Sequence, residues 1–197
     1  MLISHEVPKC LFQNSLEFND YDYALVHLFD KDPNYLKFYK DCVAQGRHVL
    51  LDNSIFELGE AYDSEQYRKL PGKKIGVVQG KTPEELIECY VYLDKHADCD
   101  KIAISFDYKL YEEIVPHENK YMSWMLGRAT VLANMLAAGV INTNKPHHLL
   151  GCGLPQEFAL YRDYNWIETI DTSNPIVHGI KGIKYEHGGL QTKESIK

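Results

Sequence analysis

The stretch HLLGCGLPQEFALYRDYNWIETID, residues 148–171, indicates the fold class more clearly than any other part of the chain. A short apolar run at 148–150 is followed by two glycines, by a segment that begins with Pro155, and by the apolar run 166–170. Proline fits the first turn of a helix, and short apolar runs are typical of buried strands. The stretch therefore predicts strand, turn, helix and strand, the repeating unit of parallel α/β proteins.

The same alternation extends toward both ends of the chain. Further strands are predicted at 2–4, 23–28, 47–51, 74–78, 101–106 and, weakly, 182–185. Helices are predicted at 33–44, 63–70, 82–95, 125–138 and 155–161. Most strands are continuously apolar, as in parallel sheets that are covered on both faces.

We expect one α/β domain over residues 1–197, with parallel strands and an active-site loop inserted around 108–121. The predicted architecture is a TIM-type (β/α) barrel, compact or partly trimmed, because a full barrel usually needs ~250 residues. A doubly wound open sheet is the alternative, since it has the same strand–helix order.

Composition restricts the environment and the partners. The net charge of −7 argues against a large nucleic-acid footprint, which needs many Lys and Arg side chains. Five singly placed cysteines favour free thiols in the cytoplasm, and no apolar stretch approaches the ~18 residues of a membrane span. No metal is expected, because adjacent His147 and His148 would point to opposite faces of a strand. Arg128 is expected on the solvated surface.

Polar residues and glycines come directly after most predicted strands, where ligand sites of parallel α/β proteins lie. Each one alone is also an ordinary turn residue. The set comprises His27, Asp52, Gln79, Gly80, Asp107, Gly151, Gly153 and Asp171. Together they predict a polar site at the carboxyl ends of the strands.

Four segments around these positions resemble one enzyme family. They are VLLDNSIFELG, GVVQGKTPEEL, HLLGCGLPQEF and ETIDTSNP, within residues 47–175. In the same order, they are similar to motifs of the tRNA-guanine transglycosylases (queuine tRNA-ribosyltransferases) and the related DNA-guanine transglycosylases. The chain lacks the CxCxxC zinc motif and the basic C-terminal region of the tRNA-acting members.

The resemblance implies a pentosyltransferase that exchanges guanine for a 7-deazaguanine base in nucleic acid through an aspartyl-glycosyl intermediate. It implies that Asp171 is the nucleophile and Asp52 the general acid and base. The substrate-binding positions that it implies are Gln79, Gly80, Asp107, Gly151, Gly153, Asn53 and Phe56. DNA is favoured over tRNA because the zinc motif is missing, and no cofactor is expected. The short chain fits a phage-encoded member acting in the host cytoplasm, and a homodimer is compatible with it.

Three other functions remain open on the sequence. Water in place of the incoming base would make a nucleoside hydrolase. A barrel without turnover would only bind a base, a nucleotide or a protein partner. A phosphodiesterase-type barrel would hold a divalent ion with Asp52, Asp107 and Asp171.

Overall fold

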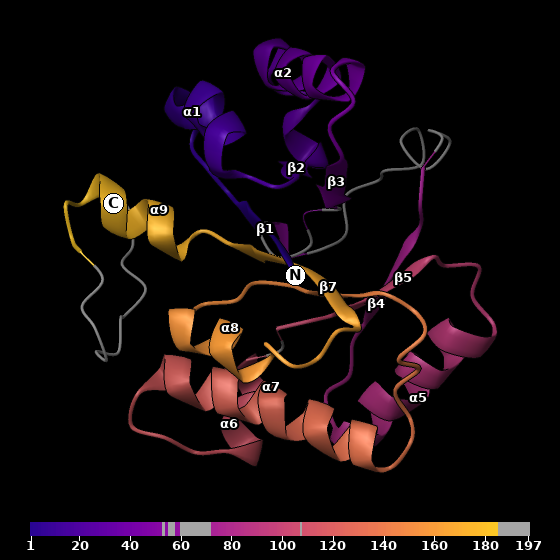
Figure 1. Cartoon of the computed structure of the whole chain (residues 1–197). Coiled ribbons are helices and arrows are strands. Elements are labelled where there is room, and N and C mark those ends of the chain that lie inside the picture. Colours follow the sequence, from indigo (N-terminus) through magenta and orange to yellow (C-terminus); the bar gives the residue numbers. More distant parts are fainter. Residues whose placement is uncertain (53, 55–57, 60–71, 107, 185–197) are drawn as a thin grey trace. The chain divides into compact units, whose positions relative to one another are not determined.

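The computed structural model describes residues 1–52, 54, 58–59, 72–106 and 108–184. The chain divides into two compact units, an N-terminal unit of Leu2–Gly72 and a C-terminal unit of Lys73–Lys197 together with Met1. Both units combine helices with parallel strands (Figure 1), which confirms the predicted α/β class. A closed barrel stays a prediction.

The N-terminal unit is built around a pair of parallel strands. Its elements are β1 (Leu2–His5), η1 (Lys9–Leu11), α1 (Phe12–Phe18), β2 (Asp22–Leu25), η2 (Val26–Leu28), α2 (Pro33–Ala44) and β3 (Val49–Asp52). Strands β2 and β3 pair in parallel, with Asp22 opposite Val49 and Leu25 opposite Asp52. The predicted strand at 23–28 is therefore shorter than expected, because its second half forms a 3-10 turn.

Helix α2 has the bounds that its sequence predicts. The Asp32 side chain accepts hydrogen bonds from the amides of Asn34 and Tyr35, and Pro33 occupies the first turn. These contacts satisfy amides that have no partner within the helix. The helix buries Tyr35 and Tyr39 in an aromatic core, whose other buried members are Phe12, Ala24, Val26 and Phe29.

The C-terminal unit contains four hydrogen-bonded parallel strands in the order β7-β6-β5-β4. Its elements are β4 (Ile75–Val78), α5 (Pro83–Lys95), β5 (Lys101–Ile104), α6 (Tyr108–Ile114), α7 (Lys120–Ala137), β6 (His147–Leu149), α8 (Pro155–Leu160), β7 (Ile167–Thr172) and α9 (Asn174–Ile180). Helices join successive parallel strands throughout the unit (Figure 1), as the alternation of apolar runs and amphipathic segments predicts.

The prediction of a loop at 108–121 is wrong, because this segment contains α6 and the start of α7. Leu110 and Tyr111 are buried, so packing stabilises a helix that its polar composition conceals. Asn119 caps α7 by accepting from the amides of Tyr121 and Met122, which starts the helix earlier than the predicted 125.

The structure differs from the predictions near the C-terminal part of the described chain. Residues 182–184 form no strand, contrary to the weak prediction there, and α9 was not predicted. The helix predicted at 63–70 lies outside the described residues.

All five cysteines are free thiols. Within the described ranges, every helix is too short or too polar to cross a membrane.

His147 makes the stability of the C-terminal unit sensitive to acid. Its Nδ1 lies 2.8 Å from the Lys145 carbonyl, and its Nε2 lies 2.9 Å from the hydroxyl of Tyr90. Burial lowers the pKa of His147 to about 4, because the charged imidazole would lose its hydration. As the pH falls below the usual histidine range, the unfolded chain takes up a proton before the folded chain does. The folded state therefore loses stability.

We expect the unfolding free energy of the wild type to fall more steeply with acid than that of His147→Gln. The difference should be about 2 kcal/mol between about pH 6.5 and pH 4.5. Urea denaturation at both pH values measures it, and the variant cancels the contributions of the other titrating groups. Equal pH dependence in the two proteins would show that His147 does not stay neutral in the folded state.

Candidate functional site

The register of the C-terminal unit brings several predicted site residues to one edge of its sheet. Val78 is opposite Ile104, Ile104 is opposite Leu149, and Leu149 is opposite Ile170. The residues that follow these four therefore lie at the same edge, and they are Gln79, Ser105, Leu150 and Asp171. This is the carboxyl end of the parallel strands, where the sequence predicts the site.

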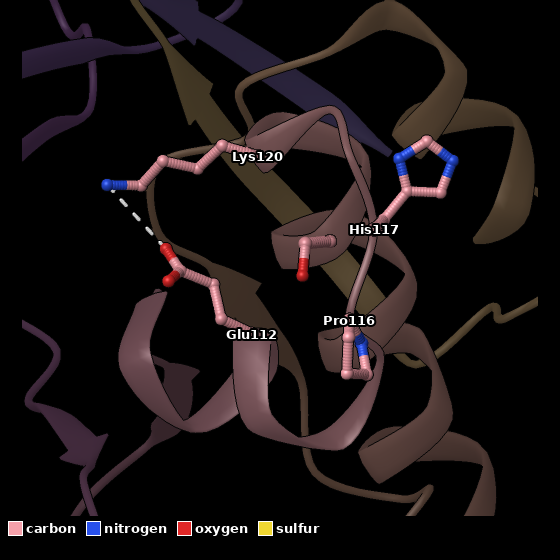
Figure 2. A pocket seen from close by; sticks show the side chains of 5 residues that line it. Glu112, Pro116, His117 and Lys120 are labelled. Carbon is pink, nitrogen blue, oxygen red and sulfur yellow. Dashed lines mark ion pairs between the residues drawn. The ribbon is translucent and has the colours of Figure 1, made fainter.

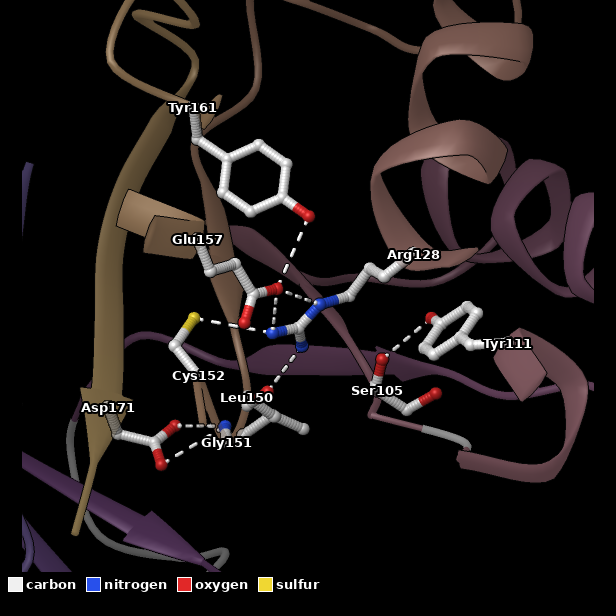
Figure 3. Close-up of polar contacts among 9 residues, drawn as sticks. All are labelled: Ser105, Tyr111, Arg128, Leu150, Gly151, Cys152, Glu157, Tyr161 and Asp171. Atoms are coloured by element: carbon white, nitrogen blue, oxygen red, sulfur yellow. Dashed lines mark hydrogen bonds and ion pairs between the residues drawn. The ribbon is translucent and has the colours of Figure 1, made fainter. Parts of the chain in front are cut away.

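Asp171 is the best-supported group at this edge. The residue is only 7% exposed, and its carboxylate has two hydrogen-bond donors. The Gly151 amide lies 3.1 Å from Oδ1 and 3.2 Å from Oδ2 (Figure 3), and His148 Nε2 lies 3.0 Å from Oδ1. Donors of this kind hold a buried carboxylate in one orientation, as a positioned carboxylate nucleophile requires.

Two polar side chains, Thr169 and Lys101, hold the other ring nitrogen of His148 through hydrogen bonds. Lys101 Nζ donates to Thr169 Oγ1 at 3.1 Å, and His148 Nδ1 lies 3.0 Å from the same oxygen. Because Lys101 occupies a lone pair of Thr169, the hydroxyl proton is free to point at Nδ1. With Nδ1 facing the Thr169 hydroxyl, Nε2 is the ring nitrogen that faces Asp171. Ala103, His148 and Thr169 are aligned across the three strands, which explains why these side chains share one face.

Gly151 needs to be glycine for two reasons. Its φ of +59° lies in the left-handed region, which a side chain disfavours. A Cβ at this position would also lie 2.9 Å from Cδ1 of Phe106. At Gly153, the carbonyl accepts from Asn174 Nδ2 at 2.6 Å, and the buried Oδ1 of Asn174 has no hydrogen-bond partner among the described residues.

Arg128 corrects the expectation of a solvated surface residue, since it is 2% exposed. Its guanidinium pairs with Glu157 of α8 and donates to the sulfur of Cys152 at 3.3 Å (Figure 3). Burial opposes its charge, but Glu157 and other neighbours hold the pKa of Arg128 above its ordinary value. For Cys152, burial and then Glu157 raise the pKa of the thiol, which argues against Cys152 as a nucleophile.

Gln79 and Gly80 follow β4, which is the last strand in the order β7-β6-β5-β4. They lie at the same carboxyl end of the strands as Asp171, but three strands away from it. Gln79 is exposed, so its amide is open to a ligand. Gly80 has a packing reason to be glycine, because a Cβ there would lie 2.4 Å from the Leu86 amide in the first turns of α5. Thr82 caps that helix by accepting from the amide of Glu85.

Asp52 ends β3 in the N-terminal unit. The hydroxyl of Tyr23 donates to its Oδ2, and the amide of Ser54 donates to its Oδ1 at 2.6 Å. The second contact closes a short side-chain turn, and Ser54 has the unusual φ of +60°. Asp52 is partly accessible, as a proton-transfer group must be. Three other predicted positions, Asn53, Phe56 and Asp107, lie outside the described residues.

The sequence points to Asp171 but not directly to the residues that support it. These are His148, which the sequence singles out only as a possible metal ligand, and beyond it Thr169 and Lys101. The even spacing of Thr169 and Asp171 on one strand was an available signal, because such residues share a face. Arg128 also stands out as the one charge in the apolar segment MLGRATVLANML, a pattern that favours a buried, paired arginine over a solvated one.

A separate pocket of about 290 Å³ lies at the turn between α6 and α7 (Figure 2). Its lining residues are Glu112, Pro116, His117, Lys120 and Ser123. Lys120 pairs with Glu112 at 3.6 Å, and Trp124 donates to the same carboxylate at 2.6 Å. None of the predicted site residues that the structure describes lines this pocket. The described residues contain no group of three His, Cys, Asp or Glu side chains placed to hold a metal ion.

Comparison of the chain with protein-family models, curated proteins and solved structures finds no match.

Proposed function

We propose that the protein is a guanine transglycosylase-like enzyme that exchanges guanine for a 7-deazaguanine base in nucleic acid, with DNA as the favoured polymer. The observation that carries the proposal is the buried carboxylate of Asp171 at the end of β7, hydrogen-bonded by His148 and by the Gly151 amide. This position is the one to which the resemblance assigns the nucleophile. DNA is favoured because residues 1–197 contain no CxCxxC motif like that of the tRNA-acting members.

The proposed reaction has two displacements at C1′ of the target nucleotide. A carboxylate oxygen of Asp171 attacks C1′, the bond from C1′ to N9 breaks, and guanine leaves with the bonding electrons and takes up a proton at N9. The incoming 7-deazaguanine then loses its N9 proton and attacks C1′, which releases the carboxylate. The resemblance assigns both proton transfers to Asp52, which stays a prediction.

His148 and Gly151 have complementary tasks in this scheme. Their hydrogen bonds hold the carboxylate in one orientation, which reduces the entropy lost on reaching the reactive geometry. They also stabilise the negative charge that returns to Asp171 when the second displacement releases it. Gln79, exposed at the same edge of the sheet, has an amide suited to the donor and acceptor groups of a purine-like base.

An exchange assay tests the proposal directly. The protein is incubated separately with a DNA duplex, a single-stranded DNA and a tRNA. Each reaction also contains isotope-labelled free guanine or a labelled free 7-deazaguanine base. Incorporation of label into one of these polymers, with release of an equal amount of unlabelled guanine, is the expected result. Asp163→Asn is the matched control for Asp171→Asn, because Asp163 is highly exposed and, in the part of the chain that the structure describes, pairs with its neighbour Arg162.

The same assay separates the alternatives. Release of guanine without incorporation of label would identify a hydrolase and contradict base exchange. Binding of a labelled base that persists in Asp171→Asn, without release or incorporation in the wild type, would identify a binding protein. No binding and no turnover with any base, polymer or free nucleoside would contradict the proposal.

A further inference from the structure

The peptide group between Leu150 and Gly151 is held at both of its ends. Its carbonyl oxygen accepts from Nη1 of Arg128 at 2.5 Å, and its N–H donates to the carboxylate of Asp171. The two contacts lie on opposite sides of the group (Figure 3), because the oxygen and hydrogen of a trans peptide point in opposite directions. One planar unit thus connects a buried arginine to the candidate nucleophile.

Arg128 also fixes the residue on the other side of Gly151. Its Nη2 donates to Cys152 Sγ. The amide of Cys152 in turn donates to the backbone carbonyl of Asp171, with 2.9 Å between nitrogen and oxygen. The guanidinium is itself anchored, since Nε and Nη2 both donate to Oε1 of Glu157 at 2.8 and 2.5 Å. This planar fork has one orientation, which a lysine ammonium would not reproduce.

A positive charge at the carbonyl oxygen strengthens the N–H as a donor. Hydrogen bonds in a chain polarise one another, and the effect is larger in a buried setting of low dielectric. Both Arg128 and Glu157 are 2% exposed, so water does not screen the contact. A buried ion pair is weak evidence for stability as such, because desolvation offsets most of its attraction. The directed contact with the peptide gives the pair a second role.

We propose that Arg128 is a positioning residue that orients and polarises the Leu150–Gly151 peptide, so that its N–H holds the Asp171 carboxylate. In this role Arg128 acts through the peptide, supported by its contact with Cys152, and not by contact with the substrate. The structural part of the inference stands on the contacts of the described residues. The catalytic part rests on the proposed function.

The test compares Arg128→Lys with Tyr161→Phe. Tyr161 donates to the same Glu157 oxygen at 3.3 Å, and its hydroxyl is not hydrogen-bonded to the peptide, so its variant controls for damage to the cluster. In ¹H–¹⁵N spectra, we expect the Gly151 amide proton to move upfield in Arg128→Lys and to stay in place in Tyr161→Phe. For base exchange, we expect kcat to fall roughly 10- to 100-fold in Arg128→Lys with KM nearly unchanged, because the weakened Gly151 N–H acts on Asp171 in the chemical step.

A double variant covers the case in which Arg128→Lys does not fold. Arg128→Met with Glu157→Met leaves no unpaired buried charge and keeps apolar bulk, so its fold is expected to survive while the Gly151 amide still shifts. An unchanged Gly151 amide in the folded Arg128 variant, or an equal shift in Tyr161→Phe, would overturn the inference. The spectra decide this even if the wild type exchanges no base, an outcome that would count against the proposed function alone.

Discussion

Replacing Asp171 by asparagine should abolish base exchange while leaving the fold intact. Asparagine has the same shape and still offers an oxygen to His148 and to the Gly151 amide, the two donors seen in the structure. Its neutral amide, however, is a very poor nucleophile at C1′. We expect kcat to fall by at least about 10³-fold, the scale seen when an enzyme loses its covalent nucleophile.

The control for this variant is Asp163→Asn, which changes the net charge equally at an exposed site. Exchange of labelled guanine measures activity, and urea denaturation shows whether both variants fold. Activity of Asp171→Asn within tenfold of the wild type would rule out Asp171 as the nucleophile, although His148 and Gly151 would still surround it.

Gly127→Ala should strongly destabilise the C-terminal unit. Gly127 lies on α7 where that helix passes over α6, and an added Cβ would be 2.4 Å from the backbone oxygen of Tyr111 and 2.6 Å from its Cα. Backbone atoms cannot move aside as a flexible side chain can. The helices would have to separate, at a cost of about 3 kcal/mol or more.

Gly179→Ala is the matched control, because nothing lies within 4 Å of the Cβ position at this helical glycine of α9. Alanine favours a helix over glycine, so this variant should be as stable as the wild type or slightly more stable. Urea denaturation measures both. Equal unfolding free energies for the two variants would contradict the close approach of α6 and α7.

The sequence predicts the regular elements well where local signals agree. Helices α2 and α5 each begin with a polar capping residue followed by proline, and their observed starts at Pro33 and Pro83 follow that pattern. Strand β5 is apolar after Lys101, whereas β7 mixes apolar with polar residues, and both lie in the parallel sheet as expected. Helix α6 could not be predicted in this way, because it is short, has no capping residue followed by proline, and is stabilised by burying Leu110 and Tyr111.

The candidate site was predictable only in part, for a related reason. Asp171 and Gly151 can be identified from the sequence, because they come directly after predicted strands. The contact of His148 with Asp171 depends on the register of β6 against β7, which contains an irregularity between His147 and His148. The contact of Arg128 with the Leu150 carbonyl depends on how α7 packs, which helical periodicity alone does not specify.

The most direct test of the central claim is to look for the covalent intermediate. Wild-type protein and Asp171→Asn are mixed with a DNA oligonucleotide and free 7-deazaguanine base, quenched during turnover, digested and analysed by mass spectrometry. The proposed function predicts a glycosyl-linked nucleotide on the wild-type peptide that contains Asp171, and none in the variant. An adduct on a different residue, or base exchange that proceeds with no adduct at any time point, would contradict the account.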